Sequence, residues 1–304
     1  MRVLVTGASG FVGQATVDAL IARGADVHAV SRQRPETAGG AIWHEADLLN
    51  HRAVESVVAA VRPDAVLHLA WYAEHGAFWN APQNLDWVSA SLVLARASAE
   101  AGSKRFVGIG TCFEYGDAND SVCSETGTPA RPADLYSVAK DACRRMIAAF
   151  AAEAGFSFAW ARLFFLYGPG EDERRLVPSL ARSLAAGESA DCSSGLVVRD
   201  FMDVRDAGEA LAAVVLSDLM GAINIGSGEA TSVAEVAEKL GVLSNRPHLV
   251  QIGALPDRPN EPSRVVADVA RLRTGLKFRP GRNLDEGLRD ALDYWARKKS
   301  RASE

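Results

Sequence analysis

The sequence lacks the features of membrane, nucleic-acid-binding and metal-binding proteins. No apolar stretch approaches the roughly 20 residues that cross a bilayer, and the chain begins MRVLVTG, a strand pattern where a signal peptide would show a charged and then an apolar region. Lysine and arginine form no dense run, and the formal net charge is -5. These absences argue against nucleic acid or an anionic membrane as the main partner, and we expect a cytoplasmic protein.

Cysteine is also scarce. The chain has four cysteines, with no C-x-x-C pair and no closely spaced histidine that would complete a metal site. We expect no metal, and reduced thiols with a structural role; the alternative is a reactive or ligand-contacting thiol. The four are Cys112, Cys123, Cys143 and Cys192.

The composition is that of an ordinary globular protein, with 304 residues, 48% hydrophobic and 23% charged, which suits one large domain or two intimate ones. Up to residue 163, apolar runs of strand type alternate with stretches of helical spacing. Strands apolar enough to be buried on both faces predict an α/β fold with a parallel, doubly wound, Rossmann-like sheet, which binds ligands beyond the carboxyl ends of its strands. Expected strands are 2–7, 26–31, 64–70, 105–110 and 156–163, and expected helices are 11–23, 51–61, 84–101 and 136–154.

After Tyr167 the rhythm changes, and further elements are expected at 175–187, 199–216, 221–228 and about 284–298. We predict a dinucleotide-binding domain formed by residues 1–165, to which residues 198–225 return. A smaller C-terminal α/β lobe, formed by residues 166–197 and 226–304, would bind the substrate.

The first strand leads into TGASGFVG, with glycines at 7, 10 and 13. Gly7 permits a sharp turn, Gly10 lets the backbone approach a pyrophosphate, and Gly13 allows the helix to pack closely on the sheet. The helix N-terminus offers unpaired N–H groups to the anion. A glycine triplet alone is weak evidence, but its place in the first strand-to-helix turn of an alternating chain predicts a dinucleotide site.

The end of the second strand bears on the choice of cofactor. NAD-binding folds usually place an acidic side chain there for the ribose 2′-hydroxyl, whereas this chain has Ser31-Arg32-Gln33-Arg34. Because Arg32 can pair with a 2′-phosphate, we expect NADP(H), with NAD(H) as the alternative. The alternative is that Arg32 and Arg34 are solvated loop charges with no role in cofactor binding.

Tyr136 and Lys140 stand four residues apart, so both project from one face of a helix. A free tyrosine titrates at about pH 10, and a nearby fixed cation moves that value toward neutrality, which makes a usable acid and base. The Y-x-x-x-K spacing is common in surface pairs. It becomes specific here because it follows a glycine-rich turn and lies 25 residues after Thr111, at the end of a strand.

From Arg2 to about Trp295 the chain resembles the extended short-chain dehydrogenase/reductase family, specifically its nucleotide-sugar epimerase, dehydratase and 4-ketoreductase group. The residues that carry the resemblance appear in the order TGASGFVG, Asp47-Leu48, DAVLHLA, GTCFEYG, YSVAK, RLFFLYGP and RDFMDV.

The resemblance implies a cofactor site. Asp47 would accept a hydrogen bond from the adenine amino group, Leu48 would lie beside the adenine ring, and Ala70 would be near the cofactor ribose. Gly7, Gly10, Phe11, Val12 and Gly13 would line the pyrophosphate. With these we count Ser31, Arg32, Tyr136 and Lys140 as cofactor-binding residues.

It also implies three catalytic residues. Tyr136 would be the acid and base, and Thr111 would hydrogen-bond the reacting oxygen. Lys140 would hold the nicotinamide ribose and lower the pKa of Tyr136.

For the substrate, Arg199 and Arg258 match arginines that grip a diphosphate. The alternatives are a salt bridge of Arg199 with Asp200 or Asp203, and an exposed loop charge for Arg258. Leu176, Val177 and Pro178 match the segment that faces the nucleotide base. Cys112, Phe113 and Phe165 complete the expected substrate contacts.

Relatives that remove water from a 4-keto sugar carry an Asp-Glu pair directly after the catalytic threonine, where this chain has Cys112 and Phe113. Neither transfers a proton as those acids do, which argues against 4,6-dehydration. The Ser31-Arg32 pair indicates exchangeable NADPH and net reduction. We therefore expect a 4-ketoreductase acting on a nucleotide-activated 4-keto-6-deoxy sugar. By resemblance it is a homodimer through the helices near 84–101 and 136–154.

One departure leaves the substrate open. The family commonly has an asparagine at the position of Phe165. A pocket lined by Phe113, Phe165, Trp71 and Trp79 suits a deoxygenated sugar and equally a non-nucleotide ketone, or these rings are plain core packing. The alternatives are a sugar-nucleotide epimerase, a reductase of another carbonyl compound, and a dinucleotide-binding regulatory protein without turnover.

Overall fold

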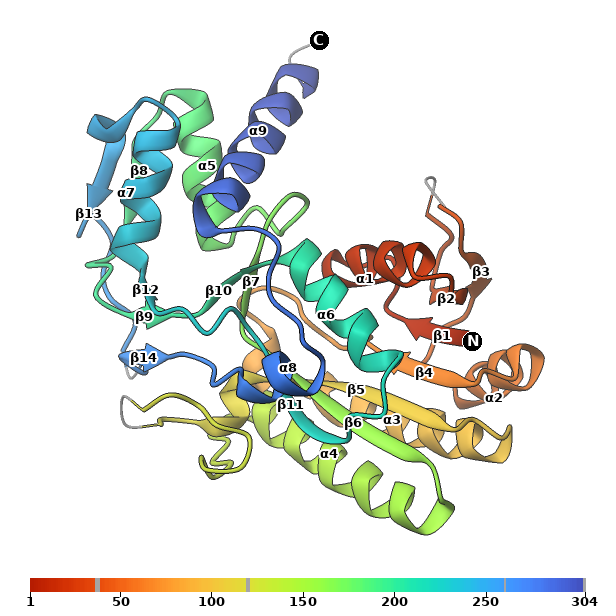
Figure 1. Cartoon of the computed structure of the whole chain (residues 1–304). Helices are drawn as coiled ribbons and strands as arrows, with labels where there is room; N and C mark the ends of the chain where they lie inside the picture. Colours follow the sequence, from red (N-terminus) through yellow and green to blue (C-terminus); the bar gives the residue numbers. More distant parts are fainter. Residues whose placement is uncertain (36–38, 119–120, 260, 303–304) are drawn as a thin grey trace.

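Seven strands form one parallel sheet at the centre of the fold, in a computed structural model that describes residues 1–35, 39–118, 121–259 and 261–302 (Figure 1). The strand order is β11-β6-β5-β4-β1-β2-β3, and every neighbouring pair is parallel. The doubly wound α/β class predicted from the sequence is confirmed. The strands are β1 (Arg2–Thr6), β2 (Asp26–Ser31), β3 (Ile42–Glu45), β4 (Ala65–His68), β5 (Arg105–Thr111), β6 (Ser157–Leu163) and β11 (Gly221–Ile225).

Alternate side chains of the strands point to opposite faces of the sheet, and each face is covered by an apolar layer. In β1, Val3 and Val5 belong to the layer under α1 (Phe11–Ala22) and α6 (Val204–Val215), whereas Leu4 belongs to the opposite layer. The opposite layer is covered by α2 (His51–Val61), α3 (Gln83–Glu100) and α4 (Leu135–Ala154) (Figure 1). No helix within the described ranges is long and apolar enough to cross a membrane.

The sequence reading missed the edge strand β3. Two of its four residues are exposed and two are partly buried, and the strand lacks the continuous apolar run by which the inner strands were recognised. The central strands β4 and β5 are buried at every residue and were predicted.

A third apolar cluster joins α5 (Leu176–Ala186), α7 (Val233–Leu243) and α9 (Leu284–Ala302) beside the sheet (Figure 1). Short strands flank these helices. β8 (Ala190–Cys192) pairs with β13 (Val250–Ile252), and β9 (Val198–Arg199) lies between β12 (Thr231–Ser232) and β14 (Arg264–Val265). β7 (Phe165–Tyr167) pairs with β10 (Phe201–Asp203), just before α6. The domain boundaries given above stay a prediction.

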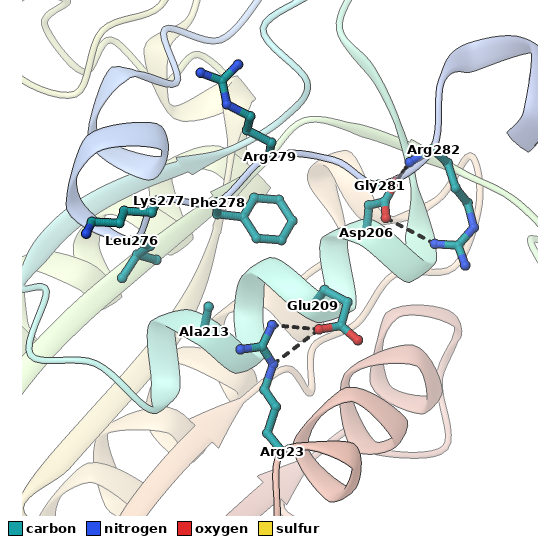
Figure 2. Close-up of a pocket in the computed structure, with 10 residues that line it drawn as sticks. All are labelled: Arg23, Asp206, Glu209, Ala213, Leu276, Lys277, Phe278, Arg279, Gly281 and Arg282. Carbon is teal, nitrogen blue, oxygen red and sulfur yellow. Dashed lines mark hydrogen bonds and ion pairs between the residues drawn. The ribbon is translucent and has the colours of Figure 1, made fainter.

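The segment after α8 (Ala270–Gly275) runs back over α6 toward α9 and encloses a pocket with α1 (Figure 2). Two ion pairs border this pocket. The Arg23 guanidinium lies 2.7 Å from the Glu209 carboxylate, and that of Arg282 lies 3.1 Å from Asp206. Figure 2 shows the Phe278 ring beside Asp206, over α6. The Arg282–Asp206 pair joins this segment to α6. Asp206 is buried, whereas Arg23 is exposed and Glu209 is partly exposed, so the pair of Asp206 is the better shielded from solvent.

A buried carboxylate, that of Glu114, anchors the end of β5. Its Oε1 accepts hydrogen bonds from the Thr111 N–H at 2.9 Å and from Trp160 Nε1 at 2.8 Å, and its Oε2 accepts from Arg162 Nε at 2.8 Å. Glu114 is 0% exposed and Arg162 is 3% exposed. The bond to Thr111 belongs to a capping box that starts η2 (Cys112–Tyr115). Glu114 therefore joins β5, β6 and η2 in the interior.

Glu114→Gln keeps the side-chain shape but leaves the buried Arg162 guanidinium without its counter-charge. We expect the free energy of unfolding, measured by urea denaturation, to fall by about 3–5 kcal/mol. Glu55→Gln is the control, because Glu55 forms an exposed pair with Arg96 at 3.2 Å. It should change the free energy of unfolding by less than about 0.5 kcal/mol. A Glu114→Gln effect no larger than that of the control would contradict the anchoring role.

Candidate active site

The turn between β1 and α1 has the geometry of a phosphate cradle. Gly7 has a φ of +68°, and a Cβ at Gly13 would lie 2.1 Å from the Gly7 carbonyl oxygen. Both positions therefore need glycine. Gly10 is the exposed N-cap of α1, whose first turn holds no acidic side chain. These N–H groups and the helix dipole suit an anionic diphosphate, so the residues present fit a dinucleotide.

The remaining predicted cofactor residues lie along the same edge of the sheet. The Ser31 hydroxyl donates to the Gln33 carbonyl at 2.6 Å, and Arg32 is exposed and forms no ion pair with any residue that the structure describes. Asp47 is also exposed, and its Oδ1 accepts from the Leu49 N–H at 3.0 Å. Leu48 is buried. The cofactor roles of these residues stay predictions.

A buried chain of polar groups supports the end of β4. The Thr6 hydroxyl and His68 Nδ1 are 2.7 Å apart, and His68 Nε2 is 2.7 Å from the Ser91 hydroxyl. Burial, and then the Lys140 charge, lower the pKa of His68 to about 3, so the ring stays neutral at pH 7. The Ala70 N–H donates to Thr6 Oγ1 at 3.3 Å. This chain fixes the backbone where Ala70 faces the Gly7 turn, 2.7 Å from a Cβ built on Gly7.

The structure brings Tyr136 and Thr111 together. Tyr136 lies in the first turn of α4, where the Asp134 carboxylate caps the helix by accepting from the Ser137 N–H at 2.9 Å. Thr111 ends β5, and its hydroxyl is hydrogen-bonded to Tyr136. Burial raises the pKa of Tyr136 above its ordinary value, while the Thr111 hydrogen bond lowers it by a smaller amount.

In the protein alone the pKa of Tyr136 is raised and does not move toward neutrality, and the effect of Lys140 on it stays a prediction. Lys140 Nζ is 6.0 Å from the Tyr136 ring centroid and donates to the Ile109 carbonyl at 2.9 Å. Burial lowers the pKa of Lys140 itself to about 7, so its ammonium is only partly populated at neutral pH.

Trp71, expected to line the substrate pocket, contacts Lys140. Lys140 Nζ lies 3.8 Å from the centroid of the Trp71 ring, a cation–π contact. The Trp71 indole N–H donates to Asn84 Oδ1 at 2.8 Å, and Asn84 is fully buried. Trp71 is thereby held as a platform for the lysine.

An aromatic wall extends from the catalytic phenol. Trp79 contacts Phe113 edge-on at 4.7 Å between ring centroids and lies 6.2 Å from Tyr136, and Phe113 contacts Phe165 at 5.9 Å. Phe78, from η1 (Phe78–Asn80), packs on Tyr136 at 4.8 Å. These rings interact with one another in tilted and T-shaped geometries. The aromatic wall consists of Phe78, Trp79, Phe113, Tyr136 and Phe165.

Cys112, which begins η2 directly after Thr111, is 2% exposed. Burial raises the pKa of its thiol well above the ordinary value, so the thiol does not exchange a proton near neutral pH. All four cysteines are free and buried.

The two predicted diphosphate arginines differ in their surroundings. Arg199 is 3% exposed, donates to Glu261 Oε1 at 2.8 Å and lies 5.2 Å from the Phe165 ring centroid. Its acidic partner is thus Glu261, and neither Asp200 nor Asp203 as the alternative reading supposed. Arg258 is exposed. The predicted base-facing residues begin α5, with Val177 and Pro178 buried and Leu176 partly exposed.

Sequence reasoning missed the loop between β7 and α5. Arg174 donates to Glu74 Oε1 at 2.8 Å and to Asp172 Oδ2 at 2.6 Å, which joins this loop to the segment after β4. The charge of Arg175 lowers the pKa of Tyr136. The partners Glu74 and Arg174 are 100 residues apart, so their contact cannot be seen in the sequence. The one local feature that could have pointed to this loop is the charged run EDERR directly after YGPG.

Known proteins with similar sequences and structures agree with this assignment of the site. The model of the NAD dependent epimerase/dehydratase family matches residues 3–226. The dTDP-6-deoxy-L-talose 4-dehydrogenase (NAD(P)(+)) of Kitasatospora kifunensis is 29% identical, with 95% of this chain and 94% of the relative covered.

Two solved structures are similar over their full length. The UDP-glucose 4-epimerase of Thermotoga maritima, with UDP-glucose, has a TM-score of 0.89 at 25% identity and covers 98% of this chain and 100% of its own. MoeE5 in complex with UDP-glucose and NAD has a TM-score of 0.84 at 32% identity and covers 99% and 100%. The chain therefore belongs to the NAD-dependent epimerase/dehydratase family, among the extended short-chain dehydrogenases/reductases that modify nucleotide sugars.

Proposed function

We propose that the protein reduces the 4-keto group of a nucleotide-activated 4-keto-6-deoxy sugar, with NADPH as the reductant. The observation that carries this proposal is the Tyr136 phenol, hydrogen-bonded to Thr111 at the end of β5 and kept protonated by burial. A protonated phenol is the form that donates a proton to a carbonyl oxygen during reduction.

When bound, the dinucleotide supplies the hydride that reaches the carbonyl carbon. Tyr136 holds the proton that the carbonyl oxygen takes up, and the Thr111 hydroxyl orients that oxygen. The phenolate left behind gains from the Thr111 hydrogen bond and from the charge of Arg175, both of which lower the pKa of Tyr136. Lys140, held between the Ile109 carbonyl and the Trp71 ring, is the residue proposed to bind the nicotinamide ribose.

The aromatic wall supports a deoxygenated sugar. Trp79, Phe113 and Phe165 offer apolar surface beside Tyr136, which favours a methyl group over a hydroxymethyl group. The buried, neutral thiol of Cys112 argues against elimination, because it cannot serve as an acid there. The Kitasatospora relative is named for a 6-deoxy sugar and a 4-dehydrogenase activity, which agrees with this substrate class.

The cofactor preference rests on Arg32. Its side chain is exposed at the end of β2, where no acidic residue precedes it, and it is available to pair with a 2′-phosphate. The solved relative MoeE5 binds NAD, so NAD(H) is the alternative.

A second candidate is a 4-epimerase that keeps its cofactor and acts on a UDP-sugar. The fold similarity to the Thermotoga UDP-glucose 4-epimerase favours it. Both candidates use Tyr136 and Thr111, and they differ in whether NADPH is consumed. The presence of Tyr136 and Lys140 side by side argues against a regulatory protein without turnover.

We also propose that α3 and α4 form the interface of a homodimer. Large apolar side chains on these helices are exposed, with Leu85 at 60%, Met146 at 53% and Val138 at 44%. Exposed apolar side chains grouped on two neighbouring helices suit a helical bundle between two copies.

Tyr136→Phe tests the proton donor. The wild-type protein should oxidise NADPH when given dTDP-4-keto-6-deoxyglucose, followed by nicotinamide absorbance. The variant should lose about 100-fold to 10,000-fold in kcat and still bind cofactor. Tyr294→Phe, on α9, is the control and should be fully active. Retained activity of Tyr136→Phe would remove this residue from the mechanism, and conversion of UDP-glucose without NADPH oxidation would favour the epimerase.

Arg32→Ala tests the cofactor preference. Loss of a charge-assisted pair with the 2′-phosphate should raise the Kd of NADPH about tenfold to 100-fold and leave the Kd of NADH unchanged, as measured by fluorescence titration. Arg34→Ala is the neighbouring control. Equal wild-type affinity for NADPH and NADH would show that Arg32 is a solvated loop charge.

Met146→Glu tests the dimer. The wild-type protein should have twice the monomer mass by light scattering at micromolar concentration, and the variant should have the monomer mass because a charge is placed in the interface. Met220→Glu is a matched control, since Met220 is also 53% exposed but lies just before β11. A monomeric wild type would contradict the proposal.

A further inference from the structure

Two polar atoms near the catalytic tyrosine are buried and have no hydrogen-bond partner among the described residues. They are Nδ1 of His75, between β4 and η1, and Oε2 of Glu171, between β7 and α5. Glu171 is 7% exposed. Buried polar atoms are nearly always paired in folded proteins, with protein groups, water or a ligand, so these two atoms mark a place where a ligand group can bind.

The two atoms belong to loops that a charged clamp joins. Arg174 bonds to Glu74, the neighbour of His75, and to Asp172, the neighbour of Glu171. The clamp therefore brings the two segments together, although they are far apart in the sequence. Because Arg174 satisfies Glu74 and Asp172, these two carboxylates are not the partners that the orphaned atoms need.

Both groups lie on the side of the site where Tyr136 is found. The charge of Arg175 acts on Tyr136, His75 and Glu171 alike. Phe78, three residues after His75, packs on the Tyr136 ring at 4.8 Å between centroids. These relations place the loops of His75 and Glu171 beside the catalytic phenol, within reach of a ligand that binds there.

The charge states of the two groups narrow the ligand chemistry. Burial raises the pKa of Glu171 to about 8, with Arg175 acting in the opposite direction, so the carboxyl group holds its proton at pH 7. Burial and the nearby charge of Arg175 lower the pKa of His75, so this ring is neutral. Two uncharged groups that both donate and accept hydrogen bonds match hydroxyl groups better than ions.

Resting on the proposed function, we propose that Glu171 and His75 bind the ring hydroxyl groups of the hexose in a nucleotide sugar, and so determine specificity for a hydroxylated ring. The hexose is favoured over the ribose of the nucleotide because the phenol of Tyr136 acts on the hexose. The hydroxyl groups would supply the hydrogen bonds that the protein alone leaves unmade.

Glu171→Met tests this role through two measurements, the Kd of the sugar nucleotide and the Tm of the protein. Calorimetric titration of the full chain loaded with NADP+, which has no hydride to transfer, would use dTDP-4-keto-6-deoxyglucose, UDP-glucose and UDP. The variant should raise the Kd of the better-bound sugar nucleotide at least about tenfold and leave that of UDP within about twofold. Its Tm without sugar nucleotide should be equal to or above that of the wild type, because an unpartnered buried polar group is removed.

Two further variants complete the design. Glu171→Gln retains a donor and an acceptor and should restore most of the affinity. Glu173→Met places the same substitution at an exposed neighbour, paired with Arg182 at 3.4 Å, and should change neither readout.

A lowered Tm with unchanged affinity would show a structural role for Glu171 and overturn the proposal. Equal losses for UDP and the sugar nucleotide would move the site to the nucleotide and overturn it as well. A wild-type protein that binds neither dTDP-4-keto-6-deoxyglucose nor UDP-glucose would contradict the proposed function first, which separates that failure from a failure of Glu171 alone.

Discussion

A buried carboxylate holds the site together. Glu114 accepts from the backbone of Thr111, from the Trp160 indole and from the Arg162 guanidinium, and is itself 0% exposed. Because one of these donors is the backbone of Thr111, the position of the threonine hydroxyl depends on the Glu114–Arg162 ion pair. A buried ion pair adds little net stability compared with apolar packing, but it specifies one arrangement strongly, since breaking it leaves an uncompensated charge. The reactive end of β5 is thereby fixed before any ligand binds.

Burial, more than pairing of charges, sets the protonation states around this anchor. It keeps Tyr136 and Glu171 protonated, His68 neutral, and Lys140 near its midpoint at pH 7. The expectation of a Tyr136 pKa near neutrality considered the cation of Lys140 without the burial of the phenol. In the interior both charged forms are disfavoured together. The protein alone is thus poised to donate a proton, and a bound anionic cofactor would favour the ammonium form of Lys140.

The parts of the site that could be predicted from the sequence are local. Gly7 and Gly13 follow from one turn, and the Tyr136–Lys140 spacing follows from one helix, so periodicity and spacing were sufficient. The parts that escaped prediction depend on long-range contacts, such as Arg174 with Glu74, or Arg199 with Glu261 across 62 residues. The protonation state of Tyr136 is likewise a property of the packed fold. Family resemblance supplied roles for single residues, but no partners for them.

The two surfaces beside Tyr136 differ in chemistry, and this difference bears on selectivity. Trp79, Phe113 and Phe165 form an apolar surface, whereas His75 and Glu171 present unpaired polar atoms. An apolar pocket discriminates weakly against an added hydroxyl group, but an unpaired buried polar group discriminates strongly against a ligand that lacks one. Selection for ring hydroxyl groups should therefore be sharper than selection for the deoxygenated carbon. It follows that sugars differing at a ring position would be separated better than sugars differing only at the methyl group.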